Sequence, residues 1–331
     1  MTLVVARIRD DRIAIASDTM TFIGPDRLPM ADWTLKSIFL PGEICVSYAG
    51  SPELAAKEFQ RFRAIFSKGA GRADVVKFFE QSSGATNNDY IVAFNNPARL
   101  VTIRNGHQTA GPSQNHWIGD KPAYERFREC ERYRRAFDAG RAVHAVLFAD
   151  EMEGSPASDL FSTMRDTLGG NMMPSAGGFI TVVSNRDHGF RHSVYSDVLL
   201  DWPDVISESD QISLTAAIDL RATEENRRFS TSQISGGYYN LNAVAFYVLS
   251  GGLLVTLHES SNGSITCGRR SAVEPQDVAP TMDQMMGFSA NAMALVMSSK
   301  AGGSIREYRT SPTQGLGIPL FCELNTLARP G

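Results

Sequence analysis

The first residues of the chain follow a pattern with a period of two. In residues 3–9 (LVVARIR), Leu3, Val5, Arg7 and Arg9 would lie on one face of an extended segment, and Val4, Ala6 and Ile8 on the other. Such alternation is typical of a β-strand. Asp10-Asp11 is a turn signal, and residues 12–17 (RIAIAS) resume the apolar alternation. The pattern therefore predicts a β-hairpin near the start of the chain.

A helical spacing of apolar residues begins after Ser51. Ser51 can cap a helix, and Pro52 suits the first helical position. Apolar residues then recur on one face at Ala55, Phe59 and Phe62. Three further helices are expected at about residues 74–81, 121–139 and 158–168.

Strand patterns lie in blocks between these helices. They cover residues 90–95, 99–106, 177–185 and 190–197, and the last two are expected to form a hairpin. Blocks of strands and of helices, without strict alternation, favour antiparallel sheets with helices layered outside them. The expected fold class is therefore α+β, with a four-layer α-β-β-α sandwich.

The chain is longer than such a sandwich needs. We expect a first domain over residues 1–200 and a C-terminal α/β extension over residues 201–331, which packs on the first domain or serves in assembly. Within the extension the patterns predict a polar helix near 212–228, strands at 242–249 and 253–259, and a Met-rich helix around 282–297.

Composition narrows the classes of function. The chain has 331 residues, of which 43% are hydrophobic, and a formal net charge of −4. This charge gives no footprint for nucleic acid or for an anionic membrane. No apolar run approaches the roughly 20 residues of a membrane span, and charged residues interrupt the start of the chain where a secretory signal would be apolar. We therefore expect a cytoplasmic protein without nucleic-acid or membrane partners.

Metal and cofactor motifs are not evident in the sequence. The four cysteines show no C-x-x-C spacing, and the six histidines show no spacing typical of a metal site. We therefore expect no metal and no cofactor, and buried free thiols instead of disulfides.

Thr2 offers a different kind of chemistry. Removal of Met1 would give a mature chain whose first residue carries both a hydroxyl and a free α-amine. An α-amine has a reference pKa of about 7.7 to 8.0, so it can accept the proton of the Thr hydroxyl near neutral pH. The sequence therefore makes Thr2 a candidate nucleophile that carries its own base.

Two longer stretches resemble a known family. Residues 2–19 (TLVVARIRDDRIAIASDT) and 35–59 (LKSIFLPGEICVSYAGSPELAAKEF) are similar to the N-terminal half of proteasome-type N-terminal nucleophile (Ntn) hydrolases. This family includes the proteasome β subunits and a bacterial ring peptidase that works with an unfoldase ATPase. Its members begin at a catalytic Thr, which is followed in order by an Asp, a Lys and an Ala-Gly-Ser or Ala-Gly-Thr turn.

The resemblance assigns four site residues by their order in this sequence. It implies that Thr2 is the nucleophile and that Lys36 is a cation beside it, which favours the alkoxide. Asp18 would hold the Lys36 ammonium, and the Gly50 backbone N–H would face the developing oxyanion. A later turn of the family normally contains a Ser, and here Asp120 stands in its place.

The family's Asp-x-x-Ser-Gly-Gly segment is matched only in part. Residues 164–183 (MRDTLGGNMMPSAGGFITVV) offer Asp166 and, after an apparent insertion, Ser175. We prefer this pair because it closes a domain of the expected size. The alternative is Ser235, which precedes two glycines but has Ser232 where the Asp should be.

The resulting hypothesis is a threonine-type hydrolase that cleaves peptide bonds in peptides or unfolded proteins. The resemblance implies a homo-oligomer that encloses its active sites, and it leaves an ATPase partner open. The alternatives are an Ntn amidase acting on non-peptide amides, and a catalytically inactive scaffold or binding subunit. Candidates for the substrate pocket are Met20, Phe22 and Ser47.

Overall fold

The structure is a computed structural model that describes most of the chain. The described residues are 2–21, 32–67, 69–109, 115–133, 143–148, 156–169, 176–186, 189–193, 195–201, 228–237, 242–248, 252–260, 263–273, 277–286, 295–300 and 304–309.

The N-terminal hairpin forms as predicted. Strands β1 (Leu3–Arg9) and β2 (Arg12–Asp18) pair antiparallel, with Arg9 opposite Arg12. Asp10 and Asp11 connect them with φ angles of 51° and 58°. Two successive residues in the left-handed region are what a tight hairpin turn requires, because their backbone twist matches that of the flanking strands.

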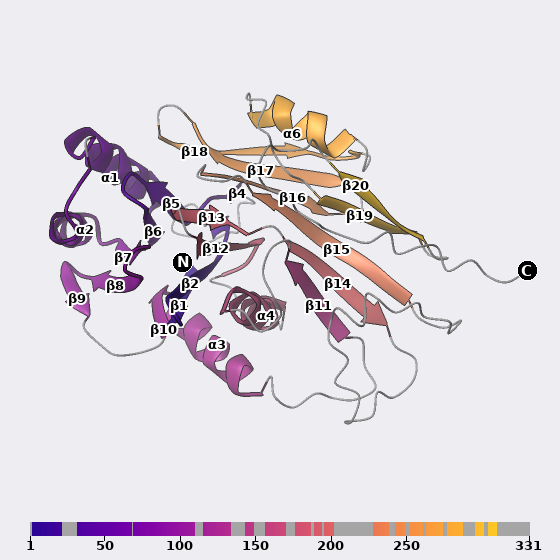
Figure 1. Ribbon diagram of the computed structural model, residues 1–331, viewed down its shortest axis with the longest axis horizontal. Coiled ribbons are helices and arrows are strands. Elements are labelled where there is room, and N and C mark those ends of the chain that lie inside the picture. Colours follow the sequence, from indigo (N-terminus) through magenta and orange to yellow (C-terminus); the bar gives the residue numbers. More distant parts are fainter. Residues whose placement is uncertain are drawn as a thin grey trace, which may run out of the picture.

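Two antiparallel five-stranded sheets form the part of the molecule around this hairpin (Figure 1). The first has the order β10-β1-β2-β12-β13, and the second the order β5-β6-β7-β8-β9. The remaining strands of the first sheet are β10 (Asn115–Gly119), β12 (Ile180–Arg186) and β13 (Gly189–His192). The strands of the second sheet are β5 (Ser37–Leu40), β6 (Ile44–Ala49), β7 (Asp89–Phe94), β8 (Arg99–Arg104) and β9 (His107–Thr109).

Helices lie against both sheets. Helix α1 (Pro52–Ile65) begins after Ser51, whose side chain accepts a hydrogen bond from the Leu54 N–H, as its sequence predicts. Helix α2 (Arg72–Thr86) contacts β7 and β8, whereas helix α4 (Pro156–Gly169) contacts β1, β2 and β12 and also helix α3 (Lys121–Tyr133).

A cluster of buried apolar residues joins the two five-stranded sheets to each other. Val4 and Ile15 of the first sheet and Cys45 and Ile91 of the second belong to this cluster, and all four are at most 1% exposed. Leu3 and Val5, on the other face of β1, belong to a larger cluster that includes side chains of α3 and α4. Strand β1 is therefore buried on both faces, which explains why its apolar run includes neighbouring residues.

A six-stranded antiparallel sheet lies beside this part of the molecule (Figure 1). Its strands, in sheet order, are β11 (Val143–Phe148), β14 (Tyr195–Asp201), β15 (Arg228–Gly237), β16 (Ala243–Val248), β17 (Leu253–Glu259) and β18 (Ile265–Arg270). The sheet therefore takes strands from both sides of residue 200. The division of the chain into two domains at that residue stays a prediction.

Smaller elements complete the described residues. They are the paired short strands β3 (Met20–Thr21) and β4 (Asp32–Trp33), the paired strands β19 (Leu295–Lys300) and β20 (Ser304–Arg309), and helix α6 (Val278–Met286). The described part is thus a mixed α and β structure with antiparallel sheets.

Two predicted elements differ from the structure. Residues 190–197 do not form one strand, because β13 ends at His192 and Tyr195 begins a strand of another sheet. The Met-rich segment is not one helix either, since α6 ends at Met286 and Met297 lies on β19. Met282 and Met286 are buried. The polar helix expected near 212–228 falls almost entirely outside the described residues.

Within the described ranges, every helix is too short or too polar to cross a bilayer.

Candidate active site

Thr2 directly precedes β1 and is 4% exposed. Its carbonyl accepts a hydrogen bond of 2.7 Å from the Asp120 N–H. The chain passes close to it at Gly119, where a Cβ atom would lie 2.0 Å from the Thr2 carbonyl oxygen. Gly119 has a φ of +101°, which favours glycine. The backbone of Thr2 is therefore fixed by the turn that follows β10.

Asp18, the last residue of β2, receives hydrogen bonds on both carboxylate oxygens. Oδ1 accepts from the Leu3 N–H at 3.0 Å and also from the Thr2 hydroxyl. Oδ2 accepts from the Gly177 N–H at 3.1 Å. The Asp18 side chain is completely buried, and hydrogen bonds of this kind stabilise the charged form of a carboxylate. Asp18 is thus held in place from two separate segments.

Lys36 completes a cluster of three polar side chains. Its ammonium donates to the Thr2 hydroxyl oxygen, to Asp18 Oδ1 at 3.1 Å and to the Met20 carbonyl at 2.7 Å. These three acceptors match the three donors of an ammonium group. Burial lowers the pKa of Lys36 from its ordinary value, while the charge of Asp18 and its hydrogen bond act in the opposite direction.

Gly50 directly follows β6, next to this cluster. Its φ of +134° lies in a region that favours glycine, and a Cβ atom here would lie 2.0 Å from Asn88 Oδ1. The buried Asn88 side chain accepts from the Ser51 N–H at 2.7 Å and donates to the Ser51 carbonyl at 3.1 Å. The Asn88 side chain therefore holds the backbone conformation of the turn that leads into α1.

Thr2, Lys36 and Gly50 line one small cavity. Its volume is about 40 Å³, and its lining also includes Met20, Thr21, Tyr48 and Pro52. Ligand pockets for small organic molecules are typically several hundred Å³, so the room beside Thr2 suits a small group. The burial of the polar cluster and its opening into a cavity together make this a candidate active site.

The pocket candidates from the sequence have different outcomes. Met20 lines the cavity. The Ser47 hydroxyl is instead 2.8 Å from the Ser37 hydroxyl within the second sheet. Phe22 lies outside the described residues.

Asp120, which stands where the family normally has a Ser, has a structural role in this chain. It lies between β10 and α3, and its Oδ2 accepts from the Ala123 N–H at 3.1 Å. A carboxylate in this position caps a helix N-terminus. Asp120 is 8% exposed and holds both the start of α3 and, through its N–H, the carbonyl of Thr2.

The structure does not bring Asp166 into the Thr2 cluster. Asp166 lies on α4 and pairs with its neighbour Arg165 at 3.3 Å, with its side chain 39% exposed. Ser175 lies outside the described residues. The alternative Ser235 lies on β15, opposite Tyr195 of β14. The roles expected for Asp166 and Ser175 stay predictions.

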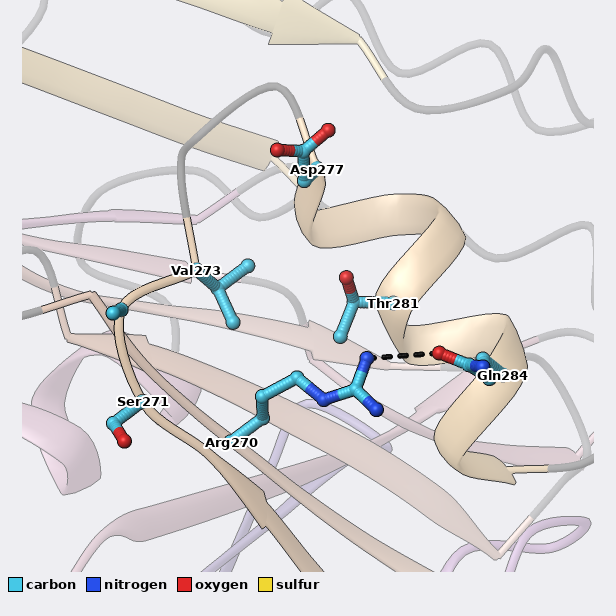
Figure 2. Close-up of a pocket in the computed structure, with 7 residues that line it drawn as sticks. Arg270, Ser271, Val273, Asp277, Thr281 and Gln284 are labelled. Carbon is cyan, nitrogen blue, oxygen red and sulfur yellow. Dashed lines mark hydrogen bonds between the residues drawn. The ribbon is translucent and has the colours of Figure 1, made fainter.

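A larger pocket lies in the six-stranded sheet region, between the end of β18 and α6 (Figure 2). Its volume is about 510 Å³, and Arg270 crosses it to donate a 2.8 Å hydrogen bond to Gln284. None of the predicted site residues is in its lining, which consists of Arg270, Ser271, Ala272, Val273, Asp277, Thr281 and Gln284. The larger pocket is therefore not the place where the candidate catalytic residues lie.

Three contributors to the site were not identified from the sequence. They are the Met20 carbonyl, the Asn88 side chain and the Gly177 N–H. Gly177 could have been found, because it follows Ser175 in the segment that was matched to the family. Nothing in the sequence around Asn88 distinguishes it from an ordinary residue after a helix.

Comparison with known proteins adds little to this geometry. No protein-family model and no curated protein matches the chain. Among solved structures, the chain is similar to eukaryotic HslV from Trypanosoma brucei with a TM-score of 0.42 and 11% sequence identity. The match covers 55% of this chain and 98% of that one. A similarity of this strength does not by itself identify an activity.

Proposed function

We propose that this chain is a threonine-type N-terminal nucleophile hydrolase that cleaves peptide bonds. The observation that carries the proposal is the hydrogen bond from the Lys36 ammonium to the Thr2 hydroxyl oxygen, within a buried cluster completed by Asp18. Three residues separated in sequence thus place a hydroxyl between a cation and a carboxylate, next to a cavity.

The proposed reaction begins once Met1 is removed. The freed α-amine of Thr2 accepts the hydroxyl proton while Thr2 Oγ1 attacks the carbonyl carbon of the scissile amide. Lys36 stabilises the developing charge on Oγ1, since its ammonium already donates to that oxygen. Asp18 keeps the buried ammonium in place and balances its charge.

The tetrahedral intermediate needs a donor for its oxyanion. Gly50 lines the cavity beside Thr2, and we assign this role to its N–H. When the intermediate collapses, the C–N bond breaks and the α-amine returns its proton to the leaving amine. The acyl group then forms an ester with Thr2 Oγ1, which a water molecule hydrolyses with the same amine as base.

The size of the cavity limits which group of the substrate can lie beside Thr2. A volume of about 40 Å³ favours a small side chain next to the scissile bond. Either a peptide or a non-peptide amide could present such a group. We favour a peptide or unfolded-protein substrate because the order of Thr2, Asp18, Lys36 and Gly50 resembles that of proteasome-type peptidases.

The proposal extends to architecture and assembly. A four-layer α-β-β-α sandwich is supported by the apolar cluster that joins the two five-stranded sheets and by the helices that contact each sheet. A homo-oligomer that encloses the active sites, an ATPase partner and a cytoplasmic location rest on the resemblance of the motifs and on composition. Size-exclusion chromatography with light scattering would test the oligomer.

Labelling of Thr2 tests the proposed function directly. The purified protein is treated with a peptide epoxyketone, which reacts with a Thr that has both a free amine and an activated hydroxyl, and the adduct is located by mass spectrometry. We expect Thr2 to be modified in the wild-type chain and not in Lys36→Met. Thr21→Ala is the matched control, because Thr21 lines the same cavity but lies inside the chain.

The other outcomes separate the alternatives. Labelling at Thr2 with turnover of acyl amides but not of a denatured protein would favour the amidase. A chain with a free Thr2 amine that neither reacts with the epoxyketone nor hydrolyses any amide would contradict the proposal and favour the inactive binding subunit.

A further inference from the structure

The six-stranded sheet reaches the segment that lines the candidate active site. Arg269, on strand β18, lies with its guanidinium carbon 4.4 Å from the centroid of the Trp33 ring. Trp33 belongs to β4, which pairs with β3 so that Trp33 is opposite Met20. Residues more than 230 positions apart in the chain are thus in contact one strand away from the site.

Trp33 is held on several sides. Its ring meets the Phe179 ring edge-on at 5.0 Å, and Phe179 stacks at 4.5 Å on Phe246 of β16. A Cβ atom added to Gly178 would lie 2.8 Å from the Trp33 ring, so the backbone there packs directly against it. The indole therefore packs between Arg269 of β18 and residues 178–179, which precede β12.

Trp33 is linked to the candidate active site through the carbonyl of Met20. Met20, the partner of Trp33 in the β3–β4 pair, accepts the 2.7 Å hydrogen bond from the Lys36 ammonium. A further backbone hydrogen bond of 2.8 Å, from Thr34 N–H to the Thr19 carbonyl, extends the contact between the two segments. A shift of Trp33 would therefore move an acceptor of Lys36.

The same sheet also supports the other partner of Lys36. Gly177 donates its N–H to Asp18 Oδ2, and it lies two residues before Phe179, which stacks on Phe246. The two hydrogen-bond partners of the Lys36 ammonium besides Thr2 are thus each linked to the six-stranded sheet through an aromatic side chain. Trp33 lies between Met20 and Arg269, and Phe179 lies between the Gly177 segment and Phe246.

We infer that Arg269 is a positioning residue of the candidate active site, which acts on Lys36 through Trp33 and the Met20 carbonyl. The inference rests on the proposed function, because it gives the six-stranded sheet a part in holding the catalytic cation. The attraction between a guanidinium and an aromatic face orients the indole. Misplacement of a catalytic group by about 1 Å can reduce a rate as much as 100-fold.

The strand itself offers a matched control. Arg270 is the next residue on β18 and is exposed like Arg269. Successive side chains of a strand point to opposite faces, and the Arg270 guanidinium donates a hydrogen bond to Gln284 of α6 (Figure 2). Arg269→Gln and Arg270→Gln each remove one positive charge, and the two positions are adjacent on the same strand. Only Arg269→Gln removes the cation from the Trp33 ring.

Two measurements on each variant test the inference. The first is the pKa of Lys36, followed by ¹³C NMR on lysine-labelled protein, with the signal assigned by its loss in Lys36→Met. The second is the rate of epoxyketone labelling at Thr2, separated into the saturating rate and the half-saturating concentration. The NMR titration needs no activity, so it remains a readout even if Thr2 does not react.

We expect Arg269→Gln to raise the pKa of Lys36, because a loosened β3–β4 pair admits water and reduces desolvation. The saturating rate of labelling should fall about 10-fold, with little change in the half-saturating concentration. Arg269→Lys should keep most of the wild-type rate, since an ammonium can also lie over an indole. Arg270→Gln should leave both measurements unchanged.

Equal effects of Arg269→Gln and Arg270→Gln would overturn the inference, as would an unchanged Lys36 pKa in Arg269→Gln. Arg269→Met guards against a general loss of packing, because it keeps an unbranched chain over the ring without the charge. If Met preserves both measurements while Gln does not, the cation has no positioning role. A wild-type chain with a free Thr2 amine that neither is labelled at Thr2 nor hydrolyses any amide would instead contradict the proposed function.

Discussion

Lys36 and Asp18 form a 3.1 Å salt bridge that is almost completely shielded from water, with side chains 3% and 0% exposed. Neither residue can lose its partner without leaving a charge in the interior. Such pairs add little net stability when complete, but the removal of one partner is strongly destabilising. The pair that we assign to catalysis is therefore also a structural element.

Lys36→Ala should affect both rate and stability. We expect a loss of at least about 100-fold in the rate of amide hydrolysis, because the Thr2 hydroxyl loses the cation beside it. We also expect a loss of about 3 kcal/mol in the free energy of unfolding, because Asp18 is left buried and unpaired. Steady-state kinetics and urea denaturation measure the two effects.

Lys57→Ala is the control for this prediction. Lys57 also pairs with a carboxylate, but it pairs with Glu53 on the exposed surface of α1, and the two side chains are 63% and 78% exposed. The same substitution there should leave rate and stability close to wild type. If Lys36→Ala behaves like Lys57→Ala, the role assigned to the buried pair is wrong.

Three variants at the start of the chain test the nucleophile. Thr2→Ala should abolish hydrolysis, whereas Thr2→Ser should keep part of it because both reacting groups remain. An uncleavable residue placed before Thr2 should be as damaging as Thr2→Ala, since an amide nitrogen does not accept a proton near pH 7. Activity measured with N-terminal sequencing of each variant decides the matter. Full activity of the blocked chain would exclude the α-amine as the base.

Gly50→Ala should disrupt the turn beside the site. The new Cβ would lie 2.0 Å from Asn88 Oδ1, and the φ of +134° is strained for any L residue. We expect loss of activity and a lower melting temperature in circular dichroism. Adding Asn88→Ala removes the collision but not the strain, so the double variant should recover only part of the stability. Complete recovery would mean that the φ angle at Gly50 is unimportant.

His192 predicts a dependence of stability on pH. The ring is 2% exposed, packs 4.8 Å from the Phe39 ring, and makes no hydrogen bond with the described residues. Burial lowers the pKa of His192 from 6.5 to about 3. Below pH 6.5 the unfolded chain therefore binds a proton that the folded chain does not. The free energy of unfolding is therefore unaffected by His192 protonation above pH 6.5, and it decreases as the pH falls from 6.5 towards 3.

The expected size is about 2 to 3 kcal/mol of unfolding free energy at pH 4.5. Urea denaturation at pH 7.5 and pH 4.5 measures it, and His192→Phe isolates the histidine from the carboxylates that titrate in the same window. The variant should lose less stability than the wild type on acidification. Parallel losses in the two proteins would show that His192 is not the residue responsible.

Features set by neighbouring residues could be predicted from the sequence. The Asp10-Asp11 turn and the Ser51 cap each depend on a few adjacent positions, and both form where the pattern placed them. The cluster of Thr2, Asp18 and Lys36 was accessible for a different reason. Their order resembles that of a family, and the structure brings the three side chains together.

Features that depend on distant parts of the chain could not be predicted. The N–H of Gly177 reaches Asp18 across 159 positions, because β12 pairs with β2. The departure of Tyr195 into another sheet is set by its pairing with β11 and β15, and its local pattern is compatible with either sheet. Alternation identifies a strand but does not identify its neighbour in the sheet.

The pairing of β2 with β12 also has a temporal consequence. A ribosome synthesises the chain from its amino terminus, so the β1–β2 hairpin emerges long before Gly177 and residues 180–186 exist. Until then Asp18 lacks the N–H that holds its second carboxylate oxygen. The residues at the very start of the chain thus depend on residues made past its midpoint, and a nascent chain cannot complete this site before they have left the ribosome.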